Sequence, residues 1–92
     1  MMKKYFLDIK FGRDTKIDID KAPDVTDEEL EKVLVELRKI FEKAEHNFKF
    51  RMVDQKYVSD FCNFLNIELR NVGIVVRMEQ IAQFEICVAF MA

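Results

Sequence analysis

The segment from Thr26 to Asn47 constrains the fold more than any other part of the sequence. It opens with Thr26, Asp27, Glu28 and Glu29, a capping box in which the threonine hydroxyl accepts a hydrogen bond from the Glu29 amide. The apolar residues that follow recur at spacings of three and four, namely Leu30, Val33, Leu34, Leu37, Ile40, Phe41 and Ala44. This pattern predicts an amphipathic helix whose stripe, with Leu37 and Phe41 at its centre, packs beneath a sheet. Asn47 is suited to the left-handed position after the helix.

Alternating apolar residues on both sides of this helix predict strands. Residues 5–11 alternate with a period of two, residues 12–14 have turn chemistry, and Ile17 and Ile19 continue the alternation, which predicts a β-hairpin. Phe48, Phe50 and Met52 predict a short strand directly after the helix. Residues 84–90 alternate again after a turn near residues 79–80, and from residue 86 onward both faces are apolar, as in a central or interface strand.

A second helix is predicted from Asp54, its N-cap, to about Asn66. Its apolar residues cover more than half of its circumference: Tyr57, Val58, Phe61, Cys62, Phe64 and Leu65. The favoured interpretation of the next residues is one long strand to Met78, with a β-bulge beside Gly73 where the inward parity changes. In the alternative, the helix runs on to Asn71 and the glycine lies just past its end.

Together these elements predict a single α+β domain over residues 1–92. The predicted order is β(β)-α-β-α-β-β, a two-layer sandwich with two helices packed on one face of a mixed, mainly antiparallel sheet. A chain of 92 residues is too short for two units that each bury a core.

Composition excludes several kinds of site. With 2 Gly and 1 Pro, no glycine-rich phosphate loop or dinucleotide fingerprint can be written. A single His and two Cys provide no His/Cys metal cage, so we expect no metal and no cofactor. Cys62 and Cys87 have apolar neighbours, which favours buried thiols in a reducing cytosol. The N-terminus meets Asp8 before any signal-peptide apolar region develops, and the apolar run of residues 86–92 is too short to span a bilayer, so we expect a cytoplasmic protein.

Catalytic candidates are few, and we expect no enzyme and no catalytic residues. His46 lies at the predicted end of the first helix, where a histidine is favoured by the helix dipole alone. The acidic stretch could offer oxygen ligands to Mg²⁺ or Ca²⁺, most directly through Asp18 and Asp20 on one strand face, with Asp14 and Asp24 nearby. The spacing fails the calcium-loop pattern, and a charged edge that discourages strand addition explains the same residues.

A basic run is the sequence basis for a nucleic-acid surface. It consists of Arg38, Lys39, Lys43, Lys49, Arg51 and Lys56. Phe48 and Phe50 are interleaved with these cations, as in surfaces that stack bases and neutralise phosphates. On a strand the two aromatics would point opposite to Lys49 and Arg51, toward the core, and the net charge of −2 gives no cationic excess.

Surplus apolar surface predicts self-association. One sheet face cannot bury all the apolar residues around the second helix, and the C-terminal strand is apolar on both sides. We therefore expect a homodimer, a small regulatory or protein-interaction module with an unidentified protein partner and no membrane contact. The residues expected at the interface are Tyr57, Phe61, Phe64, Ile86, Val88 and Phe90.

From residue 48 onward, the predicted order of strand, helix, long strand and long strand resembles Alba-type chromatin proteins and their bacterial sporulation-protein relatives. The segment from Ile67 to Ile74, IELRNVGI, is similar to the third-strand pattern of that group in its alternation and its glycine. The resemblance implies a dimeric α+β architecture. It also gives the alternative function, an Alba-like nucleic-acid-binding protein that uses the basic run, although the stretch corresponding to the basic first loop of Alba proteins is acidic here.

Overall fold

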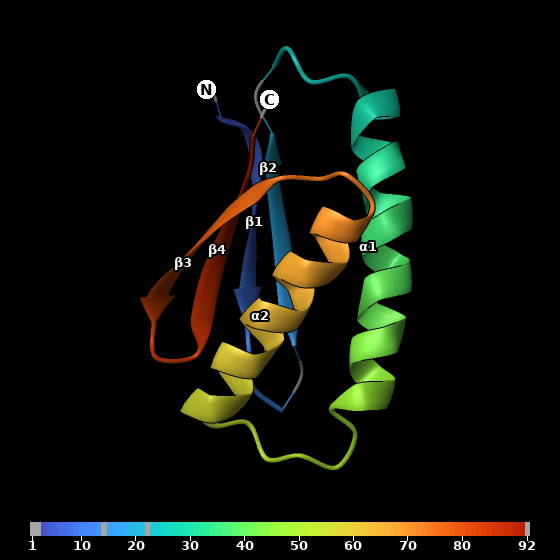
Figure 1. The fold of residues 1–92 in the computed structure, drawn as a ribbon. Coiled ribbons are helices and arrows are strands. Elements are labelled where there is room, and N and C mark those ends of the chain that lie inside the picture. Colours follow the sequence, from blue (N-terminus) through green and yellow to red (C-terminus); the bar gives the residue numbers. More distant parts are fainter. Residues whose placement is uncertain (1–2, 14, 22, 92) are drawn as a thin grey trace.

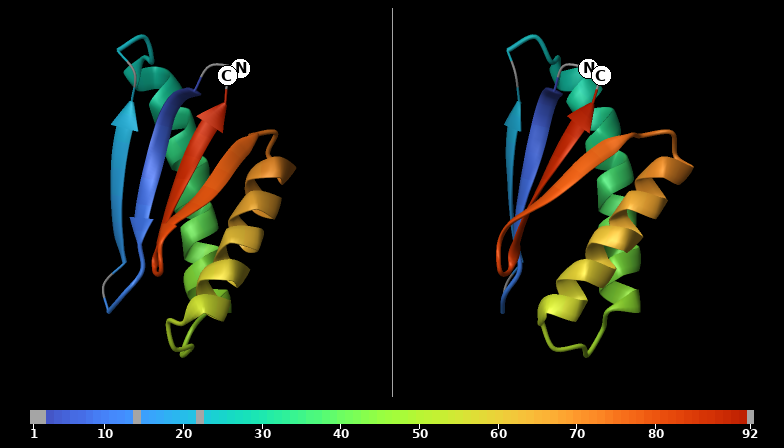
Figure 2. Two further views of the ribbon diagram at one scale, coloured as in Figure 1. Left: turned by 90° about the vertical axis from the view of Figure 1, so that its left-hand side faces the viewer. Right: turned by 60° about the vertical axis from the view of Figure 1, so that its left-hand side comes forward.

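The protein forms two layers, a four-stranded sheet and a pair of helices that covers one of its faces (Figures 1 and 2). The structure is a computed structural model that describes residues 3–13, 15–21 and 23–91. The predicted α+β class, with both helices on one face of the sheet, is confirmed.

The sheet consists of two hairpins joined through the first and last strands. The strands are β1 (Lys3–Lys10), β2 (Lys16–Lys21), β3 (Val76–Ala82) and β4 (Glu85–Met91). Their order is β2-β1-β4-β3, and every pairing among these strands is antiparallel. β4 is therefore a central strand, and β2 and β3 form the two edges. The sequence predicted a mixed, mainly antiparallel sheet, and the described strands pair antiparallel throughout.

The register of the sheet follows from the period-two alternation. Leu7 lies opposite Ile19 on one side and Val88 on the other, and Val88 in turn lies opposite Met78. This row faces the helices, and the two central residues of the row are almost completely buried. A shift of one residue would turn the whole row toward solvent, so burial fixes the register.

Helix α1 (Asp27–Asn47) begins as its sequence predicts. The Glu29 amide donates to the Thr26 hydroxyl over 3.1 Å. Leu37 is buried in the core, as expected, and Phe41 is partly buried against it. The prediction for Asn47 is wrong: Asn47 is the last residue of the helix, and the left-handed backbone occurs at Phe50, with φ 67°.

Helix α2 (Gln55–Asn71) is capped by Asp54, as predicted, and the Asp54 carboxylate accepts a hydrogen bond from the Tyr57 amide over 2.8 Å. It runs to Asn71, so the alternative interpretation is confirmed, whereas the favoured end near Asn66 and the long bulged strand are wrong. The reason lies in Leu69, which is fully buried and extends the apolar stripe of the helix by one more turn. Ile67, which the sequence placed on the same strand as Leu69, is exposed on the opposite side of the helix.

No strand forms between the helices. Residues 48–50 are a turn and residues 51–53 have no regular structure, so the predicted strand of Phe48, Phe50 and Met52 is wrong. Phe48 packs against the core, but the positive φ of Phe50 turns the chain, and Phe50 and Met52 face solvent. Without this strand, and with residues 67–71 in a helix, the topology that resembled Alba proteins is absent from this part of the chain. The last turn is also displaced, from residues 79–80 to residues 83–84.

The core lies between the sheet and both helices. Its buried members are Leu7, Ile9, Phe11, Leu37, Ile40, Ala44, Val58, Phe61, Leu65, Leu69, Ile86, Val88 and Phe90. Neither described helix is long and apolar enough to cross a membrane.

Candidate functional site

The residues expected at a dimer interface lie mostly in the core of one chain. Phe61, Ile86, Val88 and Phe90 are each at most 4% exposed, so the chain itself already covers them. β4 lies between β1 and β3 in the sheet, and on its other face, which points away from the helices, Cys87 and Ala89 are half-buried. The core residues on the inner face of β4 are therefore not available to a second copy in this fold.

The apolar residues around α2 are also largely covered by other residues of the same chain. Phe48 packs edge-on against Tyr57, with ring centroids 5.3 Å apart, and against Phe64, with centroids 5.8 Å apart. Tyr57 and Phe64 are consequently half-buried. The side of α2 that the sheet leaves uncovered thus packs against α1 and the residue that follows it.

Acidic neighbours neutralise most of the predicted nucleic-acid surface. Ion pairs join Arg38 to Glu31, Lys39 to Glu36, Lys43 to Glu68, and both Arg51 and Lys56 to Asp60. The sixth cation, Lys49, has no carboxylate within ion-pair distance among the described residues. Its Nζ lies 5.1 Å from the centre of the Phe50 ring. Five of the six cations therefore already have anionic partners within the chain.

The acidic stretch is spread along the edge strand β2. Asp18 lies opposite Asp8, and Asp20 lies opposite Phe6. Both β2 acids project to the face of the sheet without helices, because Ile17 and Ile19 face the other way. Asp14 is outside the described residues, and the described part of the chain holds no group of three or more His, Cys, Asp or Glu side chains placed to bind a metal.

The single histidine and the two cysteines lie apart in the fold. His46 is exposed in the last turn of α1. Cys62 is half-buried on α2, and burial raises the pKa of its thiol, which disfavours the reactive thiolate. Cys87 is on the central strand β4, on the face that points away from the helices.

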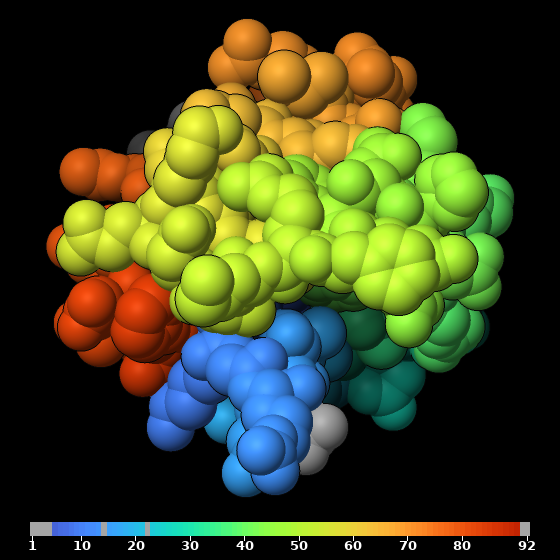
Figure 3. All heavy atoms as spheres, turned by 90° about the horizontal axis from the view of Figure 1, so that it is seen from below, coloured from blue at the N-terminus to red at the C-terminus, as the bar shows by residue number. Residues whose placement is uncertain are grey.

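Among the described residues, the most exposed large apolar side chains lie on the loop between the helices, residues 48–54. Phe50 is 94% exposed and Met52 is 80% exposed. Arg51 fixes the base of this loop, because its guanidinium lies 5.3 Å from the Phe48 ring centre and bonds to Asp60. Figure 3 shows the loop spreading across one end of the molecule, next to the tip of the β1–β2 hairpin. Sequence reasoning missed this site, because the alternation of residues 48–52 placed both aromatics in the core.

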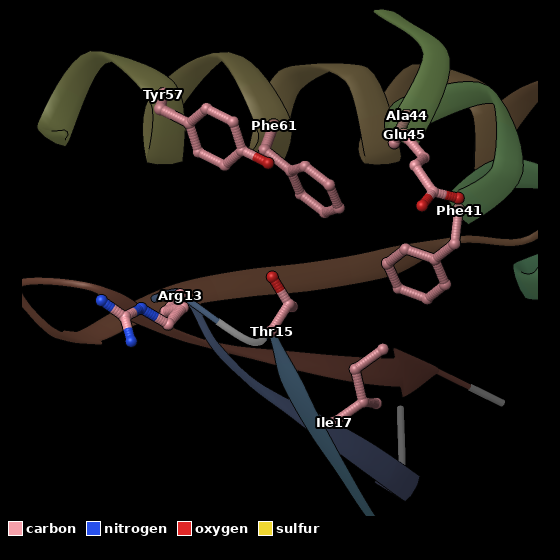
Figure 4. A pocket seen from close by; sticks show the side chains of 8 residues that line it. All are labelled: Arg13, Thr15, Ile17, Phe41, Ala44, Glu45, Tyr57 and Phe61. Carbon is pink, nitrogen blue, oxygen red and sulfur yellow. The ribbon is translucent and has the colours of Figure 1, made fainter. Parts of the chain in front are cut away.

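A groove of about 440 Å³ opens between the β1–β2 hairpin and the two helices. Figure 4 shows its lining residues, Arg13, Thr15, Ile17, Phe41, Ala44, Glu45, Tyr57 and Phe61. Burial raises the pKa of the Tyr57 phenol, a group that is protonated at neutral pH and can donate a hydrogen bond. Aromatic walls with a few polar groups at the rim suit an apolar group better than a charged one.

A second surface that the sequence did not reveal is the outer edge of β3. Val75, just before the strand, is 61% exposed, and Ile81, near its end, is 50% exposed. Between them the strand presents Arg77 and Glu79 on the face of the sheet that the helices leave open. The predicted long strand up to Met78 did not reveal this edge, because the prediction of a strand does not say which strands lie at the edges of the sheet.

Comparisons with protein-family models, with curated proteins and with solved structures found no match to this chain. The geometry of these surfaces is therefore the basis for the proposals below.

Proposed function

We propose that this protein is a small cytoplasmic protein-interaction module that acts as a homodimer. The observation that carries the proposal is the number of large apolar side chains that one chain leaves exposed. Among the described residues these are Ile17, Ile19, Val35, Phe50, Met52, Ile67, Val72, Val75 and Ile81. The exposed surface of 6445 Å² also exceeds the ~5,600 Å² that size scaling gives for a monomer of this mass. Two free cysteines are compatible with a reducing compartment.

Self-association is tested directly by sedimentation velocity or light scattering at micromolar concentration. The expected species has twice the chain mass of 11.0 kDa. A single species of the chain mass at every concentration would contradict the homodimer. A parallel titration with short RNA and DNA at low and high salt tests the alternative function. Because most of the basic run is ion-paired, we expect no salt-sensitive binding at micromolar concentration.

The loop of residues 48–54 is the element that we propose contacts a partner protein. Phe50 and Met52 offer apolar area, and Lys49 supplies a cation that forms no ion pair with a described carboxylate. These features fit a partner surface with an apolar recess bordered by acidic groups. Such aromatic anchors carry a large share of the binding energy in many interfaces.

A photo-crosslinking amino acid at position 50, in cells that make this protein, tests the loop. The matched control carries the same amino acid at position 28, an exposed site on α1. We expect a protein adduct at position 50 and none at position 28. The purified partner should then bind Phe50→Ser at least about tenfold more weakly than the parent. Equal adducts at both positions, or equal affinities, would remove the loop from the proposal.

A further inference from the structure

β3 is a free edge of the sheet with little protection against another strand. It pairs with β4 on one side only. Natural edge strands are commonly protected by lysine, proline, inward-pointing charges or β-bulges. The β3 sequence VRMEQIA contains neither lysine nor proline, and its irregularity, between Gln80 and Ala82, lies at the end of the strand. The opposite edge, β2, reads KIDIDK and carries a lysine at each end, Lys16 and Lys21. The two edges therefore differ, and β3 is the one suited to pairing.

We infer that β3 pairs antiparallel with β3 of a second copy of this chain, around a two-fold axis at Met78. This inference rests on the proposed homodimer and names its interface. In this register Arg77 lies opposite the partner's Glu79. Val75, which precedes the strand, lies near the partner's Ile81, which stands at the irregularity between Gln80 and Ala82. The two-fold axis makes each of these pairs twice. Val75 just before the strand and Ile81 near its end, both exposed in one chain, thus lie close to each other across the joined edge, and each charge meets its opposite.

Neighbouring registers lack this complementarity. A two-fold axis at Arg77 places two arginines opposite each other, and an axis at Glu79 places two carboxylates opposite each other, which is unfavourable. Registers displaced by an odd number of residues would put the helices of the two copies on opposite faces of the joined sheet. A two-fold axis at Met78 therefore fits the sequence of β3 better than an axis at Arg77 or at Glu79.

The inner face of the joined strands agrees with the same register. Met78 faces the helices in each copy and lies next to the partner's Met78 at the axis. Val76 lies opposite the partner's Gln80. The sheet becomes continuous over eight strands, and both pairs of helices lie on one side of it. The loop between the helices lies at the end of the molecule that Figure 3 shows and is not part of the joined sheet.

Charge reversal tests the register. Sedimentation velocity measures the dissociation constant of the parent, of Glu79→Arg, of Arg77→Glu and of the double variant Arg77→Glu/Glu79→Arg. Each single variant places like charges opposite each other twice, so we expect its dissociation constant to rise at least about tenfold. The double variant restores opposite charges at both positions, and we expect it to return to within about threefold of the parent.

The matched control is Asp18→Arg, a charge reversal on the other edge strand, which we expect to leave the dissociation constant unchanged. Circular dichroism of each variant shows that the fold is retained. A monomeric parent would overturn the homodimer and this interface together. A dimeric parent with unchanged single variants, or with a double variant as weak as the single ones, would overturn the β3 interface and leave the homodimer standing.

Discussion

The backbone amide of Ile74 donates a 2.9 Å hydrogen bond to the carbonyl of Leu69, five residues earlier. The Gly73 amide donates to Arg70 in the same turn, over 3.0 Å. These two bonds form a Schellman motif, which requires a left-handed residue, and Gly73 has φ +80°. The motif ends α2 and turns the chain into β3, so it sets where the edge strand begins.

Gly73→Ala should therefore lower the free energy of unfolding by about 1–2 kcal/mol, because a side chain disfavours the left-handed conformation. No atom lies within 4 Å of the added Cβ, so backbone strain is the whole expected effect. Gly12→Ala is the matched control, since its Cβ also meets no atom and its φ is not in the left-handed region. Urea denaturation measures both. Equal stabilities of the two variants would show that the helix end tolerates a side chain.

Leu37→Ala should lower the free energy of unfolding by about 2–5 kcal/mol, from lost burial and the cavity left behind. Leu37 lies in the core where α1 packs above the sheet. Val35→Ala, at an exposed position on the same helix, should change it by less than about 0.5 kcal/mol. Thermal denaturation distinguishes the two variants. A Leu37→Ala protein that melts with the parent would place the buried face of α1 elsewhere.

In the elements that the sequence predicted correctly, the apolar residues keep the same spacing over many residues. α1 is marked by a cap and a stripe of four turns, and β1 and β4 by alternation over seven residues. The predictions of secondary structure failed where a few apolar residues fit both the period of a strand and the period of a helix. Ile67 and Leu69 fit a strand by alternation, but Leu69 also lies four residues after Leu65, and burial of that helical stripe decided the outcome.

The candidate surfaces were harder to predict than the elements. Phe48 and Phe50 are the same residue type two positions apart, and one is packed while the other is exposed. A single left-handed backbone conformation at Phe50 makes the difference, and no local residue preference signals it. Likewise, the exposure of the β3 edge depends on the sheet order, which follows from pairings between residues far apart in the sequence.

Phe50→Gly should raise the free energy of unfolding by about 0.5–1 kcal/mol. Phe50 has φ 67°, a conformation that costs a non-glycine residue energy, and its side chain buries almost no area that would be lost. Phe50→Ala keeps a Cβ and should stay within about 0.5 kcal/mol of the parent. Denaturant titration of the three proteins tests this. A destabilised glycine variant would mean that the phenyl ring makes a contact that supports the fold.

The last prediction concerns acid sensitivity at Asp60, which accepts hydrogen bonds from Lys56 over 3.2 Å and from Arg51 over 3.1 Å. These bonds, that from Lys56 first, hold the pKa of the Asp60 carboxyl below its usual range. A carboxyl whose pKa is lower in the folded state stabilises the fold above its unfolded pKa. That contribution disappears as pH falls through the folded value, so the loss should occur below about pH 4.

Carboxyl NMR titration measures this pKa directly. Lys56→Gln removes one hydrogen-bond donor and should raise the pKa of the Asp60 carboxyl. The double variant Lys56→Gln/Arg51→Gln removes both donors and should raise this pKa further. Asp60→Asn should destabilise the protein more at pH 7 than at pH 3, because the parent loses the ionised carboxylate at the lower pH. An Asp60 midpoint that stays in place in both glutamine variants would mean that neither cation stabilises the carboxylate in solution.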